Sequence, residues 1–153
     1  MPPRGTLPIH DFPGTGIGAE LLPLPSADTA PFYQALAAGE LRLQRCAECG
    51  RLRYPIAPVC PWCAAPDFEW DPAPTGGEVH AWVRYHRAFV PAFAGIVPYV
   101  VVSVALERGP RLVGRLLSAA EPATAMPVEA VLEQWADGSR VPAFVPREGG
   151  GAG

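Results

Sequence analysis

The sequence predicts a mainly β protein, in which one N-terminal helix and a zinc ribbon precede a five-stranded OB-fold barrel. Two Cys-x-x-Cys pairs, separated by ten residues, predict the ribbon. Five short apolar segments after residue 76 predict the barrel, because closing a small sheet removes its exposed edges. The 20 prolines and 16 glycines among 153 residues also disfavour long helices.

Residues 1–28 are predicted to form an extended arm, because they contain six prolines and four glycines. Such an arm is expected to become ordered only against a partner or against its own body. The stretch 14–18 (GTGIG) resembles a phosphate-binding loop. It lacks the G-x-G-x-x-G spacing and no strand precedes it, so a dinucleotide site is disfavoured.

Residues 29–38 are predicted to form a helix that Asp28 or Thr29 can cap. Phe32 and Tyr33 belong to its apolar face, which recurs at helical spacing. This face either packs on the ribbon or is presented to another chain. Phe32 and Tyr33 are therefore candidate contacts to a partner.

The four cysteines of the chain are the ligands predicted for one structural Zn²⁺ ion: Cys46, Cys49, Cys60 and Cys63. Two such knuckles supply the tetrahedral sulfur shell that Zn²⁺ prefers, and a closed shell leaves no position for a substrate. The alternatives are an iron centre in the same shell, two disulfides, or an empty site. No secretory signal segment is recognisable, so a cytoplasmic location is expected, where disulfides are rare. The helix and ribbon together occupy residues 29–75.

Residues 76–148 are predicted to form the barrel, and residues 149–153 a flexible tail. Its predicted strands are Val79–Tyr85, Tyr99–Leu106, Leu112–Leu117, Val128–Trp135 and Val141–Val145. In the first strand, alternation places Val79, Ala81, Val83 and Tyr85 on the buried side. Pro142 and Pro146 indicate an edge position for the last strand. A small SH3-like barrel or an open sandwich also fits this pattern.

The bulk composition excludes several classes of function. The net charge is −3, so nothing draws the whole chain to nucleic acid or to an acidic membrane. No run of 18 apolar residues predicts a membrane span. The three histidines and the serines form no recognisable nucleophile–base arrangement, and the cysteines are committed to metal. The chain is therefore not expected to be catalytic on its own.

The ordered motifs resemble a known family, the acyl-CoA-associated zinc-ribbon plus OB-fold proteins, long catalogued as a domain of unknown function. The motifs that carry the resemblance are Gln44-Arg45-Cys46, Cys49-Gly50-Arg51, Tyr54-Pro55, Cys60-Pro61-x-Cys63, His86-Arg87, Pro91-x-Phe93, Pro98-Tyr99, Met126-Pro127-Val128-Glu129 and Pro142-x-Phe144. The resemblance spans residues 29–148. It implies a rubredoxin-like ribbon followed by an OB-fold.

The resemblance also implies an accessory subunit. Similar proteins accompany thiolase-like enzymes, including the lipid-transfer-protein-like aldolases of steroid side-chain degradation, thiolases and acyltransferases. Others accompany MaoC-like enoyl-CoA hydratases. The short arm favours a thiolase-like partner, and family analogy suggests a two-plus-two heterotetramer. Acyl-CoA is a possible shared ligand.

The first long loop of the barrel carries the remaining candidates for partner or CoA binding: Arg84, His86, Arg87, Phe89, Phe93 and Tyr99. Arginines suit phosphates, and this loop is one wall of the usual OB-fold binding face. Aromatic residues and arginine are also enriched at protein interfaces. This cluster has three interpretations: it docks a partner, it plugs the mouth of the barrel, or it contacts CoA directly.

A single-stranded nucleic-acid-binding module is the rival from another class. Residues 76–153 contain seven arginines and seven acidic residues, so the barrel lacks the surplus positive charge that such a groove needs. The ribbon is locally basic, because it contains Arg42, Arg45, Arg51 and Arg53. Nucleic acid is therefore disfavoured as a partner.

Overall fold

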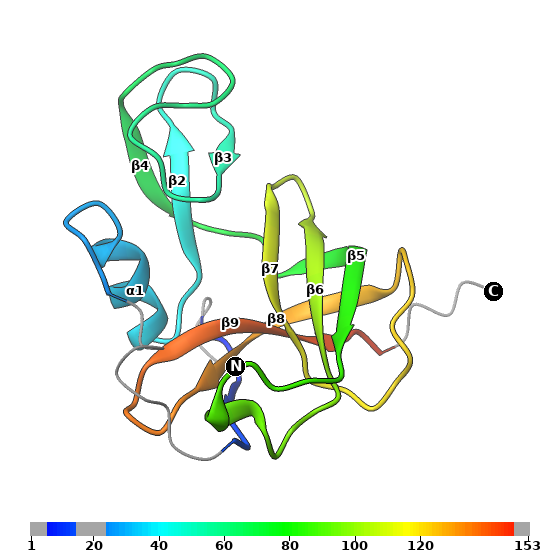
Figure 1. Ribbon diagram of the computed structural model, residues 1–153. Helices are drawn as coiled ribbons and strands as arrows, with labels where there is room; N and C mark the ends of the chain where they lie inside the picture. The colour runs from blue at the N-terminus through cyan, green and yellow to red at the C-terminus, as the bar shows by residue number, and fades with distance from the viewer. Residues whose placement is uncertain (1–5, 15–23, 149–153) are drawn as a thin grey trace.

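The computed structural model describes residues 6–14 and 24–148, and in this part the protein is mainly β (Figure 1). The predicted flexible tail and the glycine-rich stretch 15–18 lie outside the described residues. Part of the predicted arm is ordered against the protein itself. Strand β1 (Ile9–Asp11) pairs in parallel with β8 (Pro127–Gln134).

Five strands close into the predicted OB-fold barrel. Besides β8, they are β5 (Gly76–Tyr85), β6 (Tyr99–Leu106), β7 (Arg111–Leu116) and β9 (Arg140–Pro146). Their order around the barrel is β5-β6-β7-β9-β8, and β8 pairs back to β5. All neighbours in this circuit are antiparallel except β7 and β9, which are parallel.

The predicted edge position of β9 is wrong, because this strand pairs on both sides. Its ladder with β8 covers Arg140 to Pro146, and its short ladder with β7 begins at Ala143. Pro142 therefore precedes the β7 ladder, where its missing N–H is tolerated.

The predicted alternation of β5 fails after Val79. The register of β5 against β6 shifts between Val79 and Ala81, which marks a bulge at His80. Val79 is buried, whereas Ala81 and Val83 are exposed. The bulge turns the second half of the strand over and places Val83 on the outer face of the barrel.

The ribbon is a three-stranded sheet of β3 (Leu52–Arg53), β2 (Arg42–Cys46) and β4 (Phe68–Pro72), in that order. Helix α1 (Ala30–Ala37) precedes it and starts at the N-cap Thr29. Gly39 follows the helix with φ of +86°, the left-handed conformation that favours glycine.

Helix α1 packs against both the barrel and the ribbon, through β9 and β2 (Figure 1). Phe32 and Leu36 from the helix, Leu43 from the ribbon and Phe144 from the barrel belong to one buried cluster. The expectation that the helix packs on the ribbon therefore holds only in part, since the barrel shares this contact. No helix in the described residues is long and apolar enough to cross a membrane.

Candidate metal centre and adjoining grooves

The four cysteines converge on one point at the end of the ribbon. Their Sγ atoms all lie within 4.8 Å of one another. The Sγ–Sγ distance is 3.5 Å from Cys46 to Cys63 and 3.6 Å from Cys49 to Cys60. A disulfide needs about 2.0 Å, so these pairs are free thiols. Tetrahedral Zn–S bonds of about 2.3 Å would place sulfur atoms about 3.8 Å apart, which fits this arrangement.

Each knuckle is a tight turn held by the backbone. The N–H of Gly50 donates to the carbonyl of Cys46 over 3.0 Å, and the N–H of Ala64 donates to that of Cys60 over 2.9 Å. Both turn residues have positive φ, +74° for Gly50 and +62° for Ala64. Glycine adopts this conformation readily at Gly50, whereas the side chain makes it less favourable at Ala64.

In the second knuckle, the neighbouring sulfurs move the pKa values of the two thiols in opposite directions. Burial raises the pKa of Cys60, but N–H groups of Cys63 and Trp62 lower it to about 6. Cys63 accepts a hydrogen bond from Ala65 that lowers its pKa, yet burial and the neighbouring sulfurs raise it to about 11. Four thiolates repel one another at this distance, so all can ionise together only around a positive ion.

A groove of about 370 Å³ lies where helix α1, the ribbon segment directly after β3 and the barrel meet. We call it the aromatic groove. Its lining residues are Phe32, Tyr33, Tyr54, Tyr85, Phe93, Tyr99, Val101, Val113, Gly114, Arg115, Glu133, Trp135, Val141 and Pro142. Tyr99 is at its centre, stacked on Tyr85 with centroids 5.0 Å apart and 5.1 Å from the ring of Phe93.

Four of the predicted partner contacts therefore share one groove: Phe32, Tyr33, Phe93 and Tyr99. Phe32 has only 5% of its surface exposed and mainly supports Tyr33, whose ring meets it edge-on at 5.2 Å. Phe93 lies on the short 3₁₀ helix η2 (Pro91–Phe93).

Arg87 and Phe89 do not line the aromatic groove, although the ring of Phe89 meets the groove residue Tyr85 edge-on, with centroids 6.3 Å apart. Phe89 is 71% exposed, and the Cζ atom of Arg87 lies 5.6 Å from the centre of its ring. They form the tip of the long loop. As contacts to a partner or to CoA, all these residues remain a prediction.

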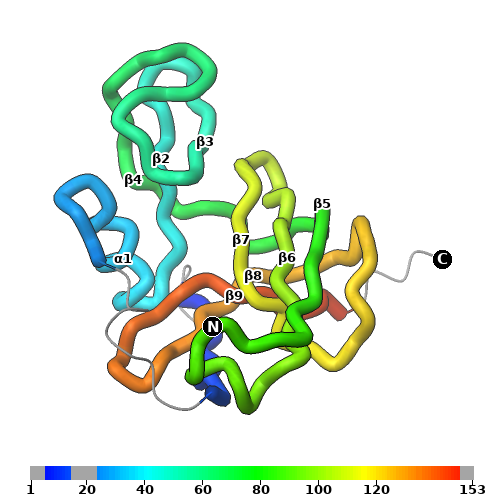
Figure 2. The backbone as a smooth tube through the Cα atoms, viewed as in Figure 1, coloured from blue at the N-terminus to red at the C-terminus, as the bar shows by residue number. Residues whose placement is uncertain are grey.

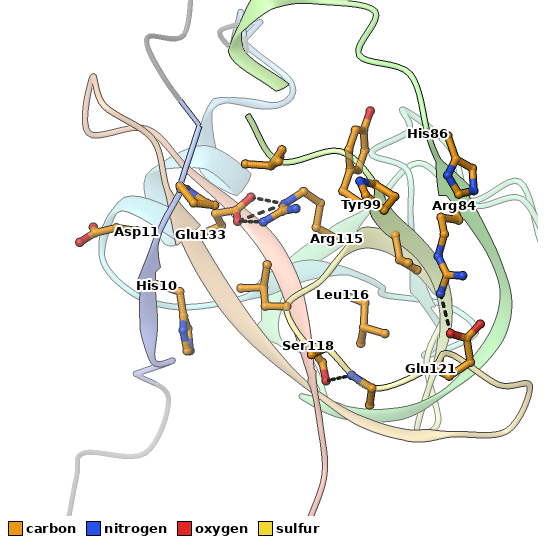
Figure 3. Close-up of a pocket in the computed structure, with 17 residues that line it drawn as sticks. His10, Asp11, Arg84, His86, Tyr99, Arg115, Leu116, Ser118, Glu121 and Glu133 are labelled. Atoms are coloured by element: carbon orange, nitrogen blue, oxygen red, sulfur yellow. Dashed lines mark hydrogen bonds and ion pairs between the residues drawn. The ribbon is translucent and has the colours of Figure 1, made fainter. Parts of the chain in front are cut away.

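A larger cavity of about 570 Å³, drawn in Figure 3, adjoins the aromatic groove and shares Tyr99, Arg115 and Glu133 with it. We call it the polar cavity. It receives Arg84 and His86, which the sequence singled out, together with His10, Asp11, Arg115, Ser118, Glu121 and Glu133, which it did not. Arg84 donates to Glu121 over 2.8 Å at its rim.

The second ion pair of the polar cavity is buried. Arg115 donates to Glu133 from both Nε and Nη2, and the shortest contact is 2.9 Å. The side chain of Glu133 is 2% exposed, and that of Arg115 is 15% exposed. Phe12, which β1 brings to this place, covers the guanidinium with its ring centre 5.6 Å away. The available sequence signal for this pair was Glu133, a carboxylate directly after the apolar run Ala130-Val131-Leu132.

Family models match most of the ordered chain. The model for the ChsH2 rubredoxin-like zinc ribbon domain matches residues 34–69, and that for the ChsH2 C-terminal OB-fold domain matches residues 70–133. A chain in the solved structure titled "Ltp2-ChsH2(DUF35) aldolase" is 34% identical, with a TM-score of 0.74. The match covers 82% of the present chain and 98% of that chain.

Two curated proteins are also similar. One is a probable enoyl-CoA hydratase alpha subunit of Thermomonospora curvata, 38% identical over 100 residues, which are 64% of this chain. The other is the 3-oxo-4,17-pregnadiene-20-carboxyl-CoA hydratase alpha subunit of Mycobacterium tuberculosis, 36% identical over 123 residues, or 79% of this chain. The matches span 30% and 39% of the lengths of these relatives. By fold, cysteine geometry and similarity, the chain belongs to the ChsH2 family, in which a rubredoxin-like zinc ribbon precedes a C-terminal OB-fold domain.

Proposed function

We propose that this chain is an accessory subunit that binds and stabilises a thiolase-fold acyl-CoA enzyme. The supporting observation is its similarity, along 98% of the relative's length, to a chain of an Ltp2-ChsH2 aldolase. An aldolase of steroid side-chain degradation is the partner that this similarity favours. A thiolase or an acyltransferase would use the same docking surface.

The proposed docking surface is the aromatic groove. Helix α1, the ribbon segment directly after β3 and the long loop each contribute aromatic side chains to it. A shared core holds the helix, the ribbon and the barrel together. Aromatic residues in concave, partly buried positions are the usual anchors of protein interfaces. The subunit can also help to hold the acyl-CoA thioester, for which Arg84 and His86 at the polar cavity are the candidates.

We further propose that the bound metal is one Zn²⁺ ion per chain. The sulfur distances and the closed shell of four thiolates support a structural role. When bound, zinc would neutralise the thiolates and lock the two knuckles together. It has no open position for chemistry.

Co-expression with a lipid-transfer-protein-like aldolase subunit, followed by size-exclusion chromatography, tests the accessory role. We expect the two chains to elute together, with a mass that reports the stoichiometry, and aldol cleavage of an acyl-CoA only in the complex. Separate elution, with acyl-CoA turnover by this chain alone, would reject the proposal.

A MaoC-like enoyl-CoA hydratase is the second candidate partner, because both curated relatives are named as hydratase alpha subunits. The same chromatography with a hydratase subunit distinguishes the two partners. The nucleic-acid alternative is weakened, since three of the four ribbon arginines are engaged within the fold. Arg42 and Arg45 pair with Glu40 and Asp71, and Arg53 is buried.

A further inference from the structure

A small cleft lies between the zinc ribbon and the turn that joins β6 to β7. Figure 2 shows the backbone of the ribbon and of this turn on the same side of the molecule. We call it the ribbon–barrel cleft. It has a volume of about 270 Å³ and is lined by Arg51, Leu52, Trp62, Leu106, Arg108 and Gly109. It shares no lining residue with the aromatic groove or with the polar cavity.

The charge of this cleft is uncompensated. Among the described residues, its lining contains two guanidinium groups and no carboxylate. Arg51 and Arg108 form no salt bridge within residues 6–14 and 24–148, whereas Arg42 and Arg45 of the same ribbon are paired. Two free guanidinium groups at one concave site favour an anion, and phosphate is one of the two groups, with carboxylate, that arginine binds through paired donors.

An exposed indole stands beside these charges. Trp62 is 53% exposed, and the Cζ atom of Arg51 lies 5.5 Å from the centre of its ring. Trp62 occupies the second knuckle between Cys60 and Cys63, so metal binding fixes its position. An exposed indole and a stacked guanidinium plane provide a surface on which an aromatic base can stack.

Arg108 lies in the turn between β6 and β7 and has an uncommon backbone conformation. Arg108 has φ of +53°, a region that residues with side chains seldom occupy. The turn is fixed by the N–H of Gly109 donating to Leu106 over 3.1 Å and by the N–H of Leu106 donating to Pro110 over 3.2 Å. Strained backbone of this kind is concentrated at binding sites.

We propose that the ribbon–barrel cleft binds the phosphate group and the base of a purine nucleotide. Its volume is below the range of about 300–1,000 Å³ for sites that enclose a whole ligand, so it receives one phosphate and one ring. Two arginines suit a single phosphate better than a polynucleotide backbone. The nucleotide is either free or the end of a CoA thioester, and the second source rests on the proposed function.

Calorimetric titration of the zinc-loaded full chain with adenosine 5′-monophosphate, at low salt, tests this site. We expect saturable binding, with adenosine and inorganic phosphate each at least about tenfold weaker. R51Q and R108Q should each weaken nucleotide binding about tenfold, the loss of one charge-assisted contact. R111Q is the matched control, because it removes the same charge from an exposed residue of the same hairpin that does not line the cleft, and it should leave binding unchanged.

Substitutions of Trp62 distinguish the contribution of base stacking to binding from the contribution of charge. Trp62→Phe keeps an aromatic face and should bind within about threefold of the parent, whereas Trp62→Ala should lose about tenfold. Zinc content is measured in every variant, so that loss of the ribbon is recognised. Tighter binding of CoA than of the mononucleotide would assign the site to the cofactor, and equal binding to a free nucleotide.

Absence of nucleotide binding at millimolar concentration would overturn the proposal. So would equal weakening by R111Q and R51Q, which would show only general attraction between charges. These measurements use the isolated chain, so failure to form a complex with an aldolase would not affect them.

Discussion

At the scale of single residues, the buried pair of Arg115 and Glu133 differs from the surface pairs of this protein. Both nitrogen donors of Arg115 face one carboxylate that is almost fully enclosed. Removing one partner of such a pair leaves the other charge unpaired and largely shielded from water. The pair between Arg84 and Glu121 has the same residue types, but the side chain of Glu121 is 71% exposed.

We predict that Glu133→Gln lowers the free energy of unfolding by about 3 kcal/mol, because Arg115 keeps its charge in a buried position. Glu121→Gln, the matched surface change, should cost less than about 1 kcal/mol. Urea denaturation of the zinc-loaded protein measures both. Equal losses in the two variants would show that burial does not distinguish the pairs.

Only one member of this residue pair was predictable from the sequence. A glutamate directly after an apolar run signals a buried charge, but its partner lies 18 positions away on another strand. The bulge at His80 was also not predictable from the sequence, because an alternating pattern does not reveal an extra residue in a strand. By contrast, the cysteine spacing identified all four candidate metal ligands, since the tight knuckles are local structures.

Tyr54 provides a prediction on pH. Burial, with a smaller contribution from Tyr33, raises the pKa of Tyr54 above its usual value of 10.0. The folded state therefore keeps the phenol proton to higher pH than the unfolded state does. The contribution of Tyr54 to stability should be constant below about pH 9 and should fall as pH rises above about 10. Tyr54→Phe should fall less steeply in urea titrations from about pH 9 to about pH 11, and an unchanged slope would contradict this.

At the scale of elements, the ribbon has little core of its own. Its sheet contains three strands, one of only two residues, and its buried leucines belong to the cluster shared with the barrel. A metal that joins the two knuckles must therefore supply much of the local stability. Helix α1 depends on its neighbours in the same way, because eight residues are too few for an independent helix in water.

We predict that Cys46→Ser unfolds the ribbon, because the three remaining thiolates bind zinc more weakly and the metal provides folding free energy. Zinc per chain should fall well below one by elemental analysis. Thermal unfolding should begin at least about 10 °C lower, as for a loss of several kcal/mol. Ala47→Ser is an exposed change between the ligands Cys46 and Cys49, and it should leave the zinc content and the onset of thermal unfolding unchanged. Full zinc content in Cys46→Ser would contradict the assignment.

At the scale of the whole molecule, one core connects the helix, ribbon and barrel, and this explains which parts of the architecture were predictable. Strand periods and turn residues identify the elements and the barrel, since both are local patterns. They do not show that α1 crosses from the ribbon to β9, or that β1 adds a strand beside β8. The division into residues 29–75 and 76–148 remains a prediction, and the shared core crosses that boundary.

The same connection makes the aromatic groove a property of the assembled molecule, and its role as the docking surface can be tested directly. We predict that Tyr33→Ala weakens binding of the aldolase subunit at least about 30-fold, the effect of losing an interface anchor worth about 2 kcal/mol. Tyr33 is half-buried at the wall of the groove, so the fold should tolerate the change. Val59→Ala, an exposed apolar truncation on the ribbon outside the groove, should bind normally.

Phe89→Ala tests the loop tip as a competing surface. Surface plasmon resonance with immobilised partner measures all three, with thermal unfolding as the check on folding. Normal binding by Tyr33→Ala together with lost binding by Phe89→Ala would move the docking surface from the groove to the loop tip.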